Sequence, residues 1–143
     1  MQTTGLAIMH VVGAYPAAPF AIGTPFLLTD IMTNIGGRIT YASGVMTLGS
    51  GSVYRCQCDV APGFGSTSNP YMYFALFEDN AQIGVGSVKV GAGTDNVNHP
   101  SDSGAAVAFI DARLASKTVS CQPTNMMHST MIGRATFDCY SLV

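Results

Sequence analysis

Hydrophobic and polar residues alternate along most of the chain with a period of two, and the helical period of 3.6 is hard to find. This alternation is typical of β-strands that bury one face. Sixteen glycines and seven prolines interrupt it, which indicates short strands joined by turns. We predict strands over Thr4–Val12, Arg38–Ala42, Val45–Leu48, Ser52–Val60, Tyr71–Phe77, Gln82–Val90, Ala105–Ala112, Ala115–Cys121 and Met131–Leu142, with Phe26–Met32 as a further strand or a short helical turn. About ten antiparallel strands in one domain, residues 1–143, indicate an all-β sandwich or barrel, of which we predict the sandwich.

Two segments are predicted to lie outside the regular strands. Gly13–Pro25 contains three prolines, and because proline donates no backbone hydrogen bond, we expect an extended arm there. The arm also carries Tyr15, Phe20 and Ile22, apolar side chains suited to lying across a neighbouring protein. Gly91–Gly104 has no structure signal and is expected to be a long polar loop.

The strand Tyr71–Phe77 is apolar on both of its faces. One face carries Met72, Phe74 and Leu76, and the other carries Tyr71, Tyr73, Ala75 and Phe77. Because a strand in a two-layer sandwich usually buries one face only, the second face needs a cover of its own. That cover is either a loop of the same chain or a subunit interface. We favour the interface, since tyrosine rings bury area while their hydroxyls keep a polar contact.

Charged residues make up only 10% of the chain, against about 25% in typical soluble domains, while 48% of the residues are hydrophobic. Obligate interfaces are likewise poor in charge, so the composition favours a protein that works inside an assembly. Lys and Arg are scattered, and no basic cluster is present to bind phosphates or an anionic membrane surface. Nucleic acid and membranes are therefore not expected as partners.

The beginning of the chain is not expected to act as a signal peptide. Leu6–Val12 is apolar, but no positive charge precedes it and His10 interrupts it. We therefore expect synthesis in the cytoplasm.

The cysteines are expected to be reduced core residues. Cys56 and Cys58 lie two apart on one predicted strand, where their side chains diverge too far for an easy bridge. We predict four free thiols, Cys121 and Cys139 included. A Cys121–Cys139 bridge would contradict both the packing and the cytoplasmic expectation. A zinc site is not expected, because Cys-x-Cys lacks a second pair of ligands at suitable spacing.

No catalytic constellation is recognisable. Glu78 and Asp79 lie at a predicted hairpin tip, where turn chemistry explains both. His10, His99 and His128 lie in different segments. His99 is the best candidate for a ligand or base, although an exposed loop position explains it better. We expect no enzymatic activity, no catalytic residue, no metal and no cofactor.

Several short segments, in the order in which they follow along the chain, resemble those of a known family. They are the Asn-x-Gly-Gly turn at 34–37, Gly-Val-Met-Thr-Leu at 44–48, Gly-Ser-Gly-Ser-Val-Tyr-Arg-Cys-Gln-Cys at 49–58 and Gly-Arg-Ala-Thr-Phe at 133–137. The chain resembles the trimeric jelly roll of the tumour-necrosis-factor and complement-head type, a fold also used by bacteriophage spike heads, fibre tips and capsid decoration proteins.

The resemblance implies a homotrimer with Tyr71, Tyr73 and Phe77 near the three-fold axis. It further implies a non-enzymatic capsid decoration (cement) protein, which is located in the virion, is assembled in the host cytoplasm, and binds the major capsid protein or another virion protein. The arm residues Tyr15, Phe20 and Ile22 are then the candidate capsid contacts. Two alternatives remain, a receptor-binding head of a phage spike or tail fibre and a soluble lectin-like binding module.

Overall fold

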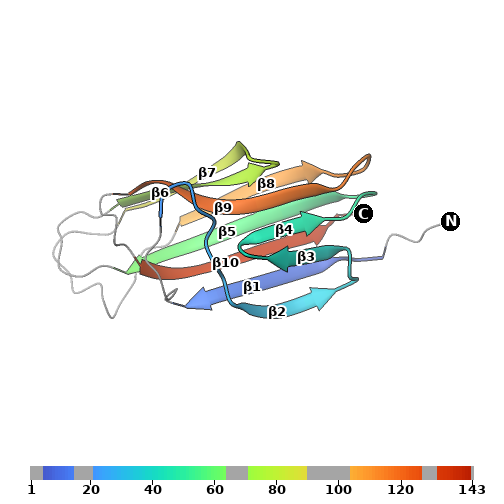
Figure 1. The fold of residues 1–143 in the computed structure, drawn as a ribbon, viewed down its shortest axis with the longest axis horizontal. Coiled ribbons are helices and arrows are strands. Elements are labelled where there is room, and N and C mark those ends of the chain that lie inside the picture. The colour runs from blue at the N-terminus through green and yellow to red at the C-terminus, as the bar shows by residue number, and fades with distance from the viewer. Residues whose placement is uncertain (1–4, 15–20, 64–70, 90–103, 127–131, 143) are drawn as a thin grey trace.

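The computed structural model describes residues 5–14, 21–63, 71–89, 104–126 and 132–142, and over these ranges the chain is all β (Figure 1). The strands are β1 (Ile8–Ala14), β2 (Asp30–Ile35), β3 (Ile39–Ala42), β4 (Val45–Leu48), β5 (Val53–Gly63), β6 (Tyr71–Glu78), β7 (Ala81–Lys89), β8 (Gly104–Asp111), β9 (Lys117–Met126) and β10 (Ile132–Ser141). They form two five-stranded sheets, sheet A in the order β2-β1-β10-β5-β8 and sheet B in the order β3-β4-β9-β6-β7. The predicted all-β jelly-roll sandwich is confirmed. No helix in the described ranges is long and apolar enough to span a membrane.

The inward faces of the two sheets share one apolar core. Along β8 buried and exposed residues alternate, as a strand between core and surface requires. Two rows of inward side chains cross sheet A, namely Met9, Cys139, Cys56 and Ala108, and Val11, Phe137, Cys58 and Ala106. Because neighbouring residues of a strand point to opposite faces, a slip of one residue would turn a whole row outward.

The segment that precedes β2 differs from the prediction. A strand or helical turn was expected over Phe26–Met32, whereas β2 begins only at Asp30 and continues through Ile35. The residues before it follow β9 instead, since the Phe26 amide donates to the Cys121 carbonyl at 2.9 Å. Phe26 and Leu28 are both buried in the core. The alternation of apolar and polar residues here therefore reflects the burial of Phe26 and Leu28 in the core, although the segment forms no regular strand.

β9 extends beyond the predicted end at Cys121 and contains Pro123. Pro123 pairs with Phe74 of β6, next to a register shift between Tyr73 and Phe74. Proline has no amide hydrogen to donate and is tolerated within a strand at such irregularities. The extra residue at this shift, Thr124, lies on β9 itself, so β9 bulges beside its proline and continues to Met126.

A disulfide joins Cys56 to Cys139, so the prediction of four free thiols is wrong. The two residues are direct partners in the antiparallel pairing of β5 with β10, and their Cα atoms lie 4.2 Å apart. Only the register of two distant strands reveals this pair. Since disulfides persist in oxidising surroundings, the cysteines no longer support the expectation of a reducing compartment.

One side of the sandwich is closed by a close approach of β7 to β8. A Cβ atom at Gly84 would lie 3.0 Å from the Val107 carbonyl oxygen. At Gly86 it would lie 2.5 Å from the Phe74 ring and 2.8 Å from the Ala105 oxygen. Glycine at these two positions lets the edge of sheet B approach the backbone of sheet A.

The substitution Gly86→Ala is expected to destabilise the fold by about 1–3 kcal/mol, the usual cost of overpacking a well-packed core. The added methyl group meets a buried ring and a backbone oxygen, neither of which moves freely. Urea unfolding measures the free energy of unfolding. Gly5→Ala is the matched control, since nothing lies within 4 Å of its added Cβ. Equal stability of the two variants would contradict the close approach.

Candidate interaction surface

The two faces of β6 have different surroundings. Met72, Phe74 and Leu76 are fully buried between the sheets. On the outward face Ala75 is also fully buried and Phe77 is half-buried, whereas Tyr73 is 45% exposed. The same chain therefore covers only part of the second apolar face, and Tyr73 stays at the surface.

Exposed apolar side chains gather on β6, β7 and β8, which lie side by side around one edge of the sandwich (Figure 1). Tyr73 and Val85 come from sheet B, and Val85 is 63% exposed. Val107 and Phe109 come from β8 in sheet A, and Phe109 is 64% exposed. We call Tyr73, Ile83, Val85, Val107 and Phe109 the β6–β8 side. Neighbouring strands contribute all five side chains, and exposed apolar surfaces of this kind mark interaction sites.

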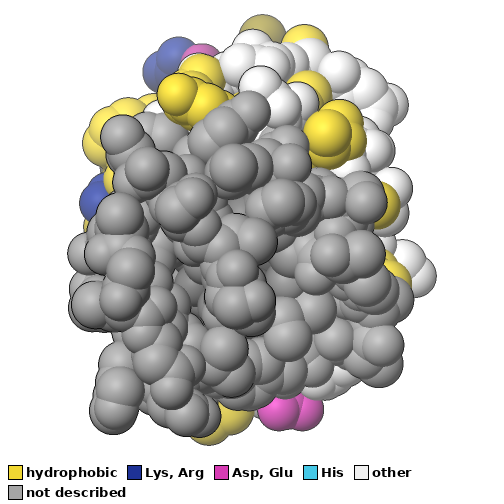
Figure 2. Space-filling model, turned by 90° about the vertical axis from the view of Figure 1, so that its left-hand side faces the viewer, with side chains coloured by type: hydrophobic (Ala, Val, Ile, Leu, Met, Phe, Trp, Pro, Cys, Tyr) yellow, Lys and Arg dark blue, Asp and Glu magenta, His cyan; other side chains and the backbone are white. Residues whose placement is uncertain are grey.

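No charged residue lies on the β6–β8 side between positions 81 and 88 or between 104 and 110. Exposed sheet edges are usually protected by charges or prolines, which prevent pairing with other chains. Figure 2 faces the left-hand end of Figure 1, where most visible atoms belong to residues outside the described ranges and hydrophobic side chains are visible among the rest. The β6–β8 side thus lacks the usual protection.

The outward face of sheet A carries a second feature, a row of polar residues that bond to one another. We call His10, Arg55, Gln57, Asp59 and Asp138 the polar strip; all five are half-buried. His10 Nδ1 pairs with the carboxylate of Asp138 on the neighbouring strand. Arg55 donates to Gln57 Oε1 at 2.9 Å, and Gln57 Nε2 donates to both oxygens of Asp59 at 3.0–3.1 Å. The charges of the strip are thus engaged within one copy of the chain.

Apolar groups border the polar strip. The Arg55 guanidinium lies 5.8 Å from the centre of the Tyr140 ring, within the range of a cation–π contact. Ile8 pairs with Tyr140 across β1 and β10, and Ile35 of β2 pairs with Ile8. The outward face of sheet A therefore combines paired charges with apolar side chains. Sheet B differs, because its outward positions on β4 and β9 carry mainly Thr, Ser and Gln.

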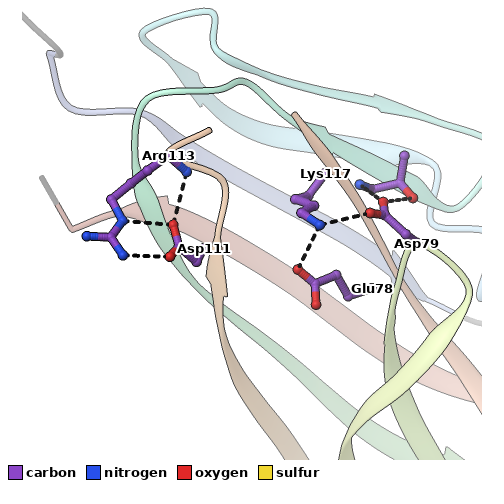
Figure 3. A network of polar contacts seen from close by, with 6 residues as sticks. Glu78, Asp79, Asp111, Arg113 and Lys117 are labelled. Carbon is purple, nitrogen blue, oxygen red and sulfur yellow. Dashed lines mark hydrogen bonds and ion pairs between the residues drawn. The ribbon is translucent and has the colours of Figure 1, made fainter. Parts of the chain in front are cut away.

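Two groups of ion pairs lie at the turns: one within the β8–β9 turn, and one that joins the β6–β7 turn to the start of β9 (Figure 3). Arg113 binds Asp111 through two side-chain hydrogen bonds of 2.9 and 2.7 Å and one backbone bond of 3.0 Å. These bonds lower the pKa of the Asp111 carboxyl to about 2. Lys117 Nζ lies 3.3 Å from Asp79 and 3.9 Å from Glu78. The Thr118 amide donates to Asp79 at 2.8 Å, and this bond is the main cause of the lowered pKa of Asp79.

The predicted site residues are placed only in part. Tyr15, Phe20, His99, His128 and the side chain of Tyr71 lie outside the described residues. Ile22 is exposed, and just after it the Gly23 amide donates to the Pro123 carbonyl at 3.0 Å. The end of the predicted arm thus contacts β9 of its own chain. Within the described ranges no three His, Cys, Asp or Glu residues are grouped to hold a metal.

Sequence reasoning missed the exposed apolar residues of β8. Val107 and Phe109 alternate with Ala106, Ala108 and Ile110, so the pattern has no polar face. The same signal drew attention to Tyr71–Phe77. On β8 it was hidden because its small inward residues, the alanines, look unremarkable in sequence.

No protein-family model matches the chain, and no curated protein matches its sequence. Solved structures match its fold. The globular domain of zebrafish complement 1qA protein is 11% identical, over 96% of this chain and 97% of that one, with a TM-score of 0.64. Murine APRIL, in a crystal structure at pH 5.0, is 7% identical over 96% and 100%, with a TM-score of 0.62. The PRD1 vertex protein P5 is 14% identical over 94% and 95%, with a TM-score of 0.55.

At such low identities the likeness shows the fold. This chain has a β jelly roll like those of complement-head and TNF-like domains and of a phage vertex protein.

The substitution Arg113→Gln is expected to raise the pKa of Asp111 from about 2 toward the ordinary value of about 3.9. Because the folded-state pKa lies below the unfolded one, the pair stabilises the fold above about pH 4 and loses this effect as the pH falls toward 2. A carboxyl-detected NMR titration measures the shift. Arg55→Gln is the control and leaves the Asp111 titration unchanged. If the pKa of Asp111 in Arg113→Gln equals that in the wild-type protein, Arg113 is not the cause of the lowered pKa.

Proposed function

We propose that the chain is a non-enzymatic structural protein of a virion, a single jelly-roll domain that binds and stabilises a bacteriophage shell as a homotrimer. The main support for this proposal is the uncharged, apolar β6–β8 side. A phage vertex protein also has the same fold. An exposed surface of this kind favours permanent association, because obligate interfaces are apolar and poor in charge. Tyr73 belongs to this surface, and Phe77 lies half-buried on the same outward face of β6.

A cyclic trimer needs two different patches, since each copy presents one surface to the next copy and receives another from the previous one. We propose that the β6–β8 side is the first patch. The second is the outward face of β1, β2 and β10 at the other side of sheet A, where His10 and Asp138 of the polar strip lie. An uncharged surface placed over the His10–Asp138 pair breaks no bond of that pair, and so avoids the strongly destabilising case of a buried charge left without its partner. The family resemblance supports a trimer with Tyr71, Tyr73 and Phe77 near its three-fold axis, and leaves this pairing of patches to the experiment.

Light scattering of the purified protein is expected to give three times the chain mass of 14.9 kDa at micromolar concentration. Tyr73→Asp is expected to give monomers, because each unpaired carboxylate in the contact costs several kcal/mol. Thr47→Asp is the control, since Thr47 is exposed on the polar outward face of sheet B. A monomeric wild-type protein would contradict the proposal.

A photo-crosslinking residue in place of Phe109 tests which surfaces meet. Crosslinks are expected between copies, from Phe109 to peptides that contain β1 or β10. Crosslinks from Phe109 to sheet B of another copy, or to the same strand in a two-fold arrangement, would leave association intact but contradict the pairing of patches.

Attachment to the particle is proposed to use the arm residues Tyr15, Phe20 and Ile22. The combined replacement of Tyr15 and Phe20 by Ser is expected to weaken co-sedimentation with virus particles at least tenfold, while the trimer and its melting temperature stay unchanged. Leu114→Ser serves as the control, because Leu114 is fully exposed in the β8–β9 turn. Unchanged attachment, or a collapse of the melting temperature, would show that the arm covers only its own sandwich. Full attachment to tail or spike structures instead of the shell would favour a receptor-binding head.

A further inference from the structure

The two cysteines outside the disulfide face each other from opposite sheets. Cys58 lies on β5 in sheet A and Cys121 on β9 in sheet B, and both are free and buried. Their thiols share a hydrogen bond. The two sulfur atoms therefore meet in the core, between layers that are otherwise held together by side-chain packing.

This thiol pair lies beside a disulfide that has already formed. Cys58 is two residues from Cys56 on the same inward face of β5, so all four sulfur atoms belong to one core. An environment that oxidises Cys56 and Cys139 is also able to oxidise a second pair of thiols in contact. Some feature of the structure must therefore slow the oxidation of Cys58 and Cys121, which are still free thiols.

Burial of the two side chains slows their oxidation. Desolvation, followed by the hydrogen bond in which the neutral Cys58 thiol takes part with Cys121, raises the pKa of Cys58 well above its ordinary value. The thiolate is the reactive form, so little of it exists near neutral pH. Neither cysteine has more than 2% of its surface exposed, and an oxidant therefore reaches the pair only when the core opens locally.

We propose that Cys58 and Cys121 are a latent disulfide site, which forms a covalent link between the two sheets when a thiol oxidant reaches the core. In this step two S–H bonds break and one S–S bond forms. Two protons and two electrons pass to the oxidant; with diamide, an azo compound, the N=N bond is reduced to the hydrazine. The existing disulfide joins neighbouring strands of one sheet, whereas this one would join the layers and oppose their separation. The inference does not depend on the virion role.

The experiment treats the native protein with diamide below its melting temperature. Remaining thiols are then alkylated after unfolding, and the intact mass and a non-reducing peptide map are measured. The expected result is a fall from two alkylatable thiols to none, a loss of two hydrogens, and a linked peptide pair from β5 and β9. A rise in melting temperature of about 5 °C or more is expected as well, because the link closes a long loop in the unfolded chain.

Cys121→Ala and Cys58→Ala are the matched controls, each keeping one thiol that diamide does not convert to an internal link. The measurement on the wild-type protein decides by itself, even if a variant folds poorly. Two thiols that persist under conditions where amide exchange shows core opening would overturn the proposal. So would a link from Cys58 to Cys56 or Cys139, or four free thiols in the untreated protein.

Discussion

The register of β5 against β10 is the constraint on which the other features of the sandwich depend. These strands are distant in sequence, since the paired Cys56 and Cys139 are 83 positions apart. Their pairing turns Cys56 and Phe137 toward the core and Gln57 and Asp138 toward the surface. A slip of one residue would exchange the two faces, exposing the sulfur atoms and burying the ionic groups. The cost of desolvating those charges therefore helps to select the register.

Few charges are present, and the described ones are largely engaged within the same copy. Asp138 is bound by His10, Asp111 by Arg113, and Asp79 by Lys117. Surface pairs of this kind add little stability by themselves, so their main consequence concerns association. A surface on which charges are paired internally does not repel a second copy, and the apolar edge then determines where contact is favourable.

The closure of the sandwich and its exposed edge have one origin. Gly84 and Gly86 bring β7 against β8, which leaves no room for inward side chains on β7 at those positions. The apolar residues between and opposite them, such as Val85 and Phe109, consequently point outward. The close approach of β7 to β8 thus closes the core and also directs apolar side chains of the β6–β8 side outward. The packing within one copy is in this way connected to its proposed assembly.

The sequence by itself determined the class of the fold and most of its strands. Alternation, glycine and proline are local signals, and they identified β3, β4, β5 and β8 closely. It also singled out Tyr71–Phe77, because a strand without a polar face is visible in the residues alone. The tertiary structure decided what depends on contacts between distant segments: the start of β2, the Cys56–Cys139 bond, the polar strip and the meeting of Cys58 with Cys121. Each of these rests on strand register or sheet packing, which local patterns do not encode because they carry no information about which strands become neighbours.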